Sequence, residues 1–344
     1  MTDKAKSLLG EIDCGKPSRR QALKVLGAAG AAMAIAPASS FAQGVCHGPI
    51  AGVSECDTTP AKLPFKPTGW KTIRLDFLTC QAADHAKEAA FHAALMNWKI
   101  RSDDGKKAVL DINDWGGMII RKSATADTKP IYDGFSWGID NWDAKKVEAA
   151  LRERGLSPVA DNSMGFESFH VKDPDGFDLW ISNGKDGARK QPAMGKTSAP
   201  APFEPTNWKT TWIDHISLEV PDYKKTAAFY HALLGWELGW DEGSQNQLEI
   251  GDLGDITIRR KKAPAGTVAT GASISHISWG ITPFDPDLVK EGLEKRGLEA
   301  KMDTGNHGDI HVAMYKSYHT ITPHGFNLQI SAANKVTRSL SGLT

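Results

Sequence analysis

The second half of the chain alternates between strand-like and helix-like patterns of apolar residues. Residues 213–220 alternate with a period of two, which is typical of a strand. One face of this strand would carry Ile213, His215 and Ser217, and the other Asp214, Ile216 and Leu218. Residues 223–234 then place apolar side chains three and four positions apart, which predicts a helix, and Gly235 stands at the position of a helix C-cap.

The same kind of pattern continues to residue 331. Further strands are predicted over residues 236–238, 247–250, 256–259, 275–281, 300–302, 310–315 and 327–331. A second helix is predicted over residues 286–296 and ends at Gly297. A strand, a helix and three strands therefore follow one another twice, as two βαβββ modules.

An internal copy of these elements precedes them. Residues 67–72 (Pro-Thr-Gly-Trp-Lys-Thr) match residues 205–210 (Pro-Thr-Asn-Trp-Lys-Thr) at an offset of 138, which holds as far as Arg121 and Arg259. The offset is 142 between the Ser-Trp-Gly-Ile segments at 136–139 and 278–281, and 149 between the Pro-x-Gly-Phe segments at 174–177 and 323–326. Identities at near-constant spacing over about a hundred residues indicate a tandem duplication.

The duplication predicts an α+β protein of four βαβββ modules, paired into two domains. The expected segments are a signal peptide at 1–42, an irregular arm at 43–67, a first domain at 68–185, a linker at 186–205, a second domain at 206–332 and a tail at 333–344.

The N-terminus has the features of an export signal. Arg19 and Arg20 precede a weakly apolar, Ala- and Gly-rich run over residues 25–37, and Ser-Phe-Ala at 40–42 provides a small-x-small cleavage site. These features resemble a twin-arginine signal, which implies export of the folded protein to the periplasm by the twin-arginine machinery and cleavage after Ala42. The apolar run is shorter than the roughly 20 residues that span a bilayer, so no stable membrane span is expected.

Cysteine usage and charge constrain the protein further. Cys46 and Cys56 in the arm would be able to pair in an oxidising compartment, which leaves Cys80 as a small buried thiol on the first strand. The 41 basic and 41 acidic residues give no net charge, which argues against a nucleic-acid partner.

Paired βαβββ modules with these motifs resemble the vicinal oxygen chelate superfamily. The first strands of the two later modules read His-Ile-Ser at 215–217 and 276–278, and the last strand follows Pro-x-Gly-Phe and reads Leu-Gln at 328–329. The superfamily includes glyoxalase I, extradiol ring-cleaving dioxygenases and bleomycin-resistance proteins. The resemblance covers nearly everything after residue 68. It implies that the two modules of a domain curl mixed sheets around a cavity, which in the best-known members holds one divalent metal.

The ring-cleaving dioxygenases of this superfamily bind their metal through two histidines and a glutamate. Carried onto this sequence, those positions are His215, His276 and Gln329. Neutral imidazoles suit a borderline divalent metal and leave coordination positions open on one face. The resemblance therefore implies Fe(II) or Mn(II) rather than Zn(II). Gln329 departs from the pattern, because an amide oxygen is a weaker ligand than a carboxylate.

The first copy serves as an internal control. Its equivalents of the three ligand positions are Phe77, Gly134 and Trp180, none of which binds a metal. We therefore expect a first domain that keeps the scaffold without ligands and a second domain that carries the site.

Other polar residues near the last strands are candidates for catalysis. His311 fits the histidine of the extradiol signature, and His319 fills its tyrosine position, where it would act as an acid or base. Against a catalytic role for His319, the ligand-less copy has His170 at the same position. Arg121 and Arg259 also recur in both copies; either could meet an anionic substrate, but their recurrence favours a structural or solvated role.

These residues lead to three hypotheses about function. The first is a periplasmic, metal-dependent enzyme that cleaves a catechol-type small molecule in the extradiol manner, in the second domain. The second is a glyoxalase-like isomerase or lyase on the same scaffold. The third is a non-catalytic protein that binds a small molecule, as bleomycin-resistance proteins do, and Gln329 favours this hypothesis.

The twin-arginine assignment predicts that changing Arg19 and Arg20 together to Lys keeps the protein in the cytoplasm with its signal intact. Fractionation and intact-mass measurement would check this. A double variant that still reaches the periplasm and is cleaved after Ala42 contradicts the assignment.

Overall fold

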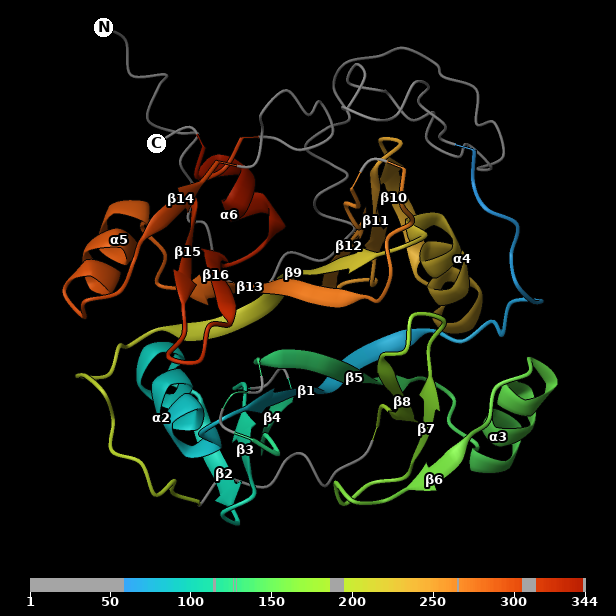
Figure 1. Cartoon of the computed structure of the whole chain (residues 1–344), viewed down its shortest axis with the longest axis horizontal. Coiled ribbons are helices and arrows are strands. Elements are labelled where there is room, and N and C mark those ends of the chain that lie inside the picture. The colour runs from blue at the N-terminus through green and yellow to red at the C-terminus, as the bar shows by residue number, and fades with distance from the viewer. Residues whose placement is uncertain are drawn as a thin grey trace, which may run out of the picture. The chain divides into compact units, whose positions relative to one another are not determined.

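The computed structural model describes residues 59–113, 116–125, 127, 129–185, 195–264, 266–304 and 314–342 (Figure 1). The expected signal peptide and the cysteines of the arm, Cys46 and Cys56, lie outside these residues. Cys80 is a free, buried thiol on the first strand, as expected. Within the described ranges, no helix is long and apolar enough to cross a membrane.

Each copy of the duplication forms one eight-stranded mixed sheet (Figure 1). The first sheet contains β1 (Thr72–Ala82), β2 (Lys99–Asp103), β3 (Lys107–Asp111), β4 (Gly117–Lys122), β5 (Ile131–Ile139), β6 (Val159–Asp161), β7 (Ser168–Lys172) and β8 (Asp178–Asn183). The second contains β9 (Lys209–Val220), β10 (Glu237–Asp241), β11 (Gln245–Glu249), β12 (Gly254–Arg260), β13 (Ser273–Thr282), β14 (Lys301–Asp303), β15 (Ser317–Ile321) and β16 (Asn327–Ala332).

The two sheets have the same topology. Their orders are β2-β3-β4-β1-β5-β8-β7-β6 and β10-β11-β12-β9-β13-β16-β15-β14. In each, an antiparallel central pair, β1–β5 or β9–β13, is flanked on both sides by parallel neighbours. The expected α+β fold of duplicated βαβββ modules is therefore confirmed.

One helix belongs to each module, and each of these four helices begins directly after an aspartate. The helices are α2 (His85–Met96), α3 (Ala144–Glu153), α4 (Tyr223–Leu234) and α5 (Pro286–Glu294). The capping carboxylates of Asp84, Asp143, Asp222 and Asp285 accept backbone N–H groups of the first turn. Helix α4 ends at Gly235, whose φ of 71° is left-handed, as the C-cap prediction required.

A β-bulge interrupts the central strand of each sheet. In β9, His215 lies opposite Ser278 and Ile213 opposite Trp279, so that Asp214 is the extra residue. The extra residue inverts the alternation of faces. Ile213 therefore joins the hydrophobic core, and the expectation that it shares a face with His215 is wrong.

Two expectations near the C-terminus also differ from the structure. The predicted strand over 310–315 is absent from its described part, Met314 and Tyr315, and the strand is β15, which pairs with β14 and β16. The expected tail contains a helix, α6 (Lys335–Leu340), which Asn334 begins with a capping box. The first sheet has no equivalent of α6 among the described residues.

The two copies pack against each other through matched contacts. The indole N–H of Trp98 donates to Thr210 Oγ1 at 2.9 Å, and the equivalent Trp236 donates to Thr72 Oγ1 at the same distance. On one side, Thr226 of α4 donates to Asp175 of the first copy at 2.5 Å. These contacts relate the copies as two halves of one folded body.

The matched contact on the other side joins a carboxylate to two histidines. Glu88 of α2, at the position of Thr226, lies 2.7 Å from Nδ1 of His324 in the turn after β15, and 3.1 Å from Nε2 of His92. The side chain of Glu88 is fully buried. Although burial would raise it, hydrogen bonding with His324 and His92 lowers the pKa of Glu88 to about 2.

This contact predicts how the stability of the protein changes in acid. The ordinary pKa of Glu88 is 4.5, so the unfolded chain takes up a proton that the folded chain does not. The contribution of Glu88 to stability is therefore complete above that value and lost as the pH falls towards 2. Glu88→Gln should lower the free energy of unfolding by about 3 kcal/mol at pH 6 and weaken its decline in acid.

Urea unfolding at several pH values from about 6 to 3 would measure both effects. Glu148→Gln provides a matched control, because Glu148 forms an exposed helix ion pair with Arg152. An equally steep acid decline in the Glu88 variant and the wild type would contradict the prediction.

Candidate functional site

A row of polar side chains crosses the second sheet from β11 to β14. We call the following residues the polar row: Gln245 on β11, Arg259 on β12, His215 and Ser217 on β9, His276 on β13, Gln329 on β16, His319 on β15 and Asp303 on β14. Hydrogen bonds, an ion pair and ring contacts link its members. The sheet thus brings His215, His276, Gln329 and His319 of the predicted site together.

The two predicted histidine ligands face each other. Their Nε2 atoms lie 2.9 Å apart. Nδ1 of His215 lies 3.3 Å from a carboxylate oxygen of Asp214. Nδ1 of His276 lies 3.1 Å from Oγ of Ser275, which itself donates to the carbonyl of Ser217 at 3.3 Å. With both Nδ1 atoms protonated and donating to these oxygens, the two Nε2 lone pairs point at one shared space.

The surroundings of both imidazoles favour their neutral form. Burial lowers the pKa of His215, and the neighbouring Asp214 only partly offsets this. Burial lowers the pKa of His276 further below its ordinary value, and the adjacent His215 adds to the effect. The neutral form is the one that binds a metal ion.

Gln329 is buried at the predicted position of the third ligand. Its side-chain nitrogen donates to Ser317 Oγ at 2.7 Å and to Asp303 Oδ2 at 3.2 Å. Its side-chain oxygen is buried and has no hydrogen-bond partner among the described residues. A buried acceptor without a donor is costly, so this oxygen is suited to a cation or to a donor from outside the described residues.

No group of three or more His, Cys, Asp or Glu side chains in the described part of the chain is arranged to hold a metal. The polar row offers two imidazoles and an amide oxygen instead. Asp303, which the sequence did not single out, fixes the amide of Gln329 and also accepts a hydrogen bond from Tyr315 at 3.3 Å.

His319 differs from its copy in the first sheet by the ring nitrogen that it uses. Nε2 of His170 lies 2.6 Å from the carboxylate of Asp178. In His319, Nδ1 lies 2.8 Å from the amide oxygen of Asn327, while Nε2 faces Asp303 at 3.5 Å. Because an amide oxygen only accepts, Nδ1 of His319 carries a proton and Nε2 remains able to accept one within the polar row. The recurrence of His170 therefore does not make the two histidines equivalent.

The other predicted catalytic residue, His311, lies outside the described residues. The neighbouring Tyr315 is described and buried. Burial and the carboxylate of Asp303 raise its pKa well above the ordinary value for tyrosine. Tyr315 is therefore a neutral hydrogen-bond donor next to the polar row.

The first sheet has an apolar cluster where the second has the polar row. Phe77, at the position of His215, packs against Trp180 with ring centroids 5.3 Å apart and against Phe166 at 6.2 Å. A Cβ atom on Gly134 would lie 2.3 Å from the carbonyl oxygen of Asp178, so a histidine does not fit there without movement. Aromatic side chains thus occupy the position of the histidines in the first sheet.

Two charged residues that support His215 were missed by the sequence analysis. Asp214 is fully buried at the bulge, and Arg338 of α6 donates to its carboxylate. Although burial would raise it, Arg338 and His215 lower the pKa of Asp214 well below its ordinary value. Arg338 also lies over the ring of Tyr315, 4.9 Å from its centroid. The segment of the first copy that corresponds to α6 at the last repeat offset, residues 186–191, lies outside the described residues.

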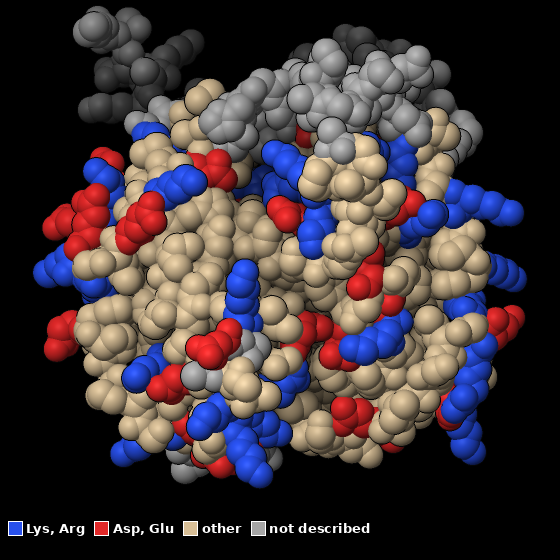
Figure 2. Space-filling view, viewed as in Figure 1, with Lys and Arg blue, Asp and Glu red and all other residues tan. Residues whose placement is uncertain are grey.

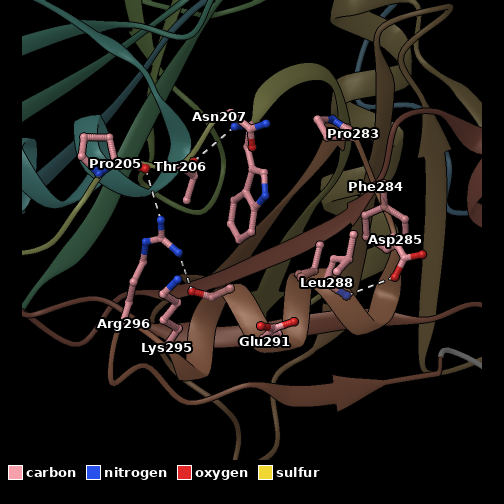
Figure 3. Close-up of a pocket in the computed structure, with 13 residues that line it drawn as sticks. Pro205, Thr206, Asn207, Pro283, Phe284, Asp285, Leu288, Glu291, Lys295 and Arg296 are labelled. Carbon is pink, nitrogen blue, oxygen red and sulfur yellow. Dashed lines mark hydrogen bonds between the residues drawn. The ribbon is translucent and has the colours of Figure 1, made fainter.

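A pocket of about 490 Å³ lies beside α5, and no histidine of the polar row lines it (Figure 3). Figure 3 shows Arg296 extending from the end of α5 to Pro205. Arg154 binds the carbonyl of Pro67 in the same way at the end of α3, so this contact belongs to the duplicated scaffold. On the face seen in Figure 2, basic and acidic side chains are interspersed, in line with the balanced net charge.

The polar row lies within a recognisable domain. Residues 212–330 match the family model of the Glyoxalase/Bleomycin resistance protein/Dioxygenase superfamily. This part of the chain is similar to the domains of that superfamily. Comparison with curated proteins gave no match.

Solved structures of the glyoxalase-like fold resemble most of the chain. The Mn(II)-bound glyoxalase from Novosphingobium aromaticivorans is 17% identical, with a TM-score of 0.57 over 78% of this chain and 86% of that one. A catechol 2,3-dioxygenase is 14% identical, with a TM-score of 0.58 over 77% and 89%. The 2,3-dioxygenase LapB from Pseudomonas sp. KL28 is 15% identical, with a TM-score of 0.56 over 76% and 92%. At these identities the likeness establishes the fold.

The dependence of Asp214 on Arg338 is testable. Arg338→Met should leave a buried carboxylate without its cation and lower the free energy of unfolding by about 3 kcal/mol at neutral pH. Adding Asp214→Asn should recover part of that loss, because it removes the stranded charge. Chemical unfolding of the single and double variants would check this. A double variant as unstable as the sum of its single changes would show that the two groups are not coupled.

Proposed function

We propose that the glyoxalase-like domain at residues 212–330 is a metal-dependent oxygen-chelate enzyme that cleaves a catechol-type ring in the extradiol manner. His215, His276 and Gln329 would hold one Fe(II) or Mn(II) ion. The observation that carries the proposal is the pair of imidazole Nε2 atoms 2.9 Å apart on neighbouring strands.

This pair suits a shared cation. Two nitrogens bound to one ion at a right angle, each about 2.1 Å from it, are about 3 Å apart. Without an ion, one Nε2 would donate an N–H···N hydrogen bond to the other at this distance. With both protons on Nδ1, the two Nε2 lone pairs repel unless a cation lies between them. The carboxylate of Asp214 beside Nδ1 of His215 is also the kind of partner that orients histidine ligands. The unpartnered oxygen of Gln329 supplies a third donor, so the residues fit a metal ion.

A bound ion would supply Lewis acidity that lowers the pKa of a hydroxyl group on the substrate. The chain's own residues would handle the proton and position the ring. His319 holds its Nδ1 proton against Asn327 and can accept a proton at Nε2. Asp303, next to Nε2 of His319, would stabilise the imidazolium that forms. Within the row, His215, Ser217 and Gln329 are buried and the other members are half-buried, so water is excluded mainly from its centre.

Export is part of the same proposal. The paired arginines and the cleavage motif support a periplasmic enzyme carried by the twin-arginine route, which would accept a folded, metal-loaded protein.

A second function is favoured by one specific observation. The third donor is an amide, which binds Fe(II) and Mn(II) less strongly than a carboxylate. A non-catalytic domain that binds a small molecule would need no stronger donor. The fold also accommodates glyoxalase-like isomerisation, since a Mn(II)-bound glyoxalase is among the similar structures.

Metal content separates these possibilities. The purified mature protein should contain about one divalent ion per chain, and its melting temperature should rise on addition of Fe(II) or Mn(II). His215→Ala or His276→Ala should abolish both. Gln329→Glu should bind the ion more tightly, by about tenfold or more, because a carboxylate is the better ligand.

His170→Ala in the first domain is the matched control and should leave metal binding unchanged. Oxygen uptake with a series of catechols, followed with the absorbance of the ring-opened product, tests the reaction itself. If the wild-type protein holds no metal and no added ion raises its melting temperature above that of His215→Ala, the enzyme proposal fails. Tight binding of a catechol without oxygen uptake would favour the binding protein.

A further inference from the structure

Arg259 is the one arginine of the polar row, and its surroundings differ from those of its copy. In the first sheet, Arg121 donates to the carboxylate of Asp133, which also accepts hydrogen bonds from Thr79 at 2.5 Å and Gln81 at 2.7 Å. This guanidinium therefore has a counter-ion within the chain.

The second sheet keeps the arginine and removes the carboxylate. At the bulge of β13, Ser275 stands where Asp133 stands in β5. The contacts of Arg259 go to uncharged groups instead: one nitrogen donates to Ser217 Oγ, and Nε donates to Gln245 Oε1 at 2.6 Å. Gln245 occupies the position that Lys107 has in the first sheet. Around Arg259, the second sheet therefore lacks both the carboxylate of Asp133 and the lysine that surround Arg121.

Arg259 forms no ion pair with a carboxylate in the described part of the chain. Asp303, Glu219 and Glu242 act on it only at longer range. A partly buried guanidinium without a counter-ion is unfavourable, because its desolvation is not repaid. The change from Asp133 to Ser275 therefore leaves a cation that an external anion would stabilise.

The position of Arg259 places such an anion beside the histidines. Ser217 accepts a hydrogen bond from Arg259 and lies opposite His276 in the register of β9 and β13. A planar anion bound to the outer nitrogens of Arg259 would thus lie one strand away from the facing Nε2 atoms. We propose that Arg259 binds a carboxylate on the substrate, so that the site selects aromatic diols that carry a carboxylate side chain.

This inference rests on the proposed function only for the claim that the substrate carries a catechol ring. The binding of a carboxylate by Arg259 does not depend on that function. Two kinds of probe separate them. Phenylacetate carries the carboxylate but has no vicinal oxygens, and 4-methylcatechol carries the vicinal oxygens but no anion. The compound 3,4-dihydroxyphenylacetate combines the two groups.

Dissociation constants measured without oxygen on the metal-loaded mature protein provide a readout other than activity. The wild type should bind 3,4-dihydroxyphenylacetate at least tenfold more tightly than 4-methylcatechol. Arg259→Gln should abolish that preference and leave the affinity for 4-methylcatechol within about twofold. Arg121→Gln, the matched change in the first domain, should alter neither. Phenylacetate should raise the melting temperature of the wild type but not that of Arg259→Gln.

Each alternative result has one meaning. Equal affinity of the wild type for the charged and neutral catechols, or a preference that survives Arg259→Gln, overturns the inference and leaves the proposed function standing. Stabilisation by phenylacetate through Arg259, without binding of either catechol, supports the anion site and overturns the proposed ring chemistry. Binding of none of the three probes overturns both.

Discussion

A buried carboxylate at the bulge of the central strand determines how each half of this protein is built. In the first sheet, the hydrogen bonds that Asp76 accepts include those from Ser136 of β5 and Ser182 of β8. In the second, Asp214 accepts from Ser278 and from the guanidinium of Arg338. Because a buried charge must be compensated, these partners fix the bulge. The bulge in turn decides which side chains face the core and which face the polar row.

Duplication then allowed the two halves to diverge in what they do with the same scaffold. The first half fills the position of the imidazoles with aromatic packing around Phe77 and Trp180, which contributes to stability and offers no metal ligand. The second half replaces those rings with His215 and Gln329 and must satisfy more polar atoms. Among the described residues, the side-chain oxygen of Gln329 has no hydrogen-bond donor and Arg259 has no carboxylate partner, which are costs that a purely structural sheet would avoid.

Much of the fold could be predicted from the sequence because the repeat offsets mark equivalent positions directly. The observed register agrees with them: Ser136 lies opposite Phe77 and Trp180, as Ser278 lies opposite His215 and Gln329. The helix α4 and its C-cap followed from local patterns, which depend on few distant contacts. The face of Ile213 did not, because a bulge is a pairing event between strands that alternation in one strand cannot reveal.

The candidate site was less accessible to sequence reasoning. His215, His276 and Gln329 could be found by comparing the copies, since each replaces an apolar residue or glycine. Asp303 could not, because its counterpart Asp161 accepts a hydrogen bond from Trp180 in the first sheet, and so the residue looked like scaffold. The difference at Arg259 was hidden for a similar reason: the arginine itself recurs, and only its partner changes.

The dependence of Asp214 on Arg338 has a consequence for the order in which the protein is made. Residues 209–332 contain every strand of the second sheet, yet the cation that neutralises its buried carboxylate belongs to the last turn of α6, which follows the last strand. On the ribosome, all the strands emerge before Arg338. The support of His215 is therefore completed only after the whole sheet has been synthesised, and a chain that stops short of α6 lacks it even though its sheet sequence is whole.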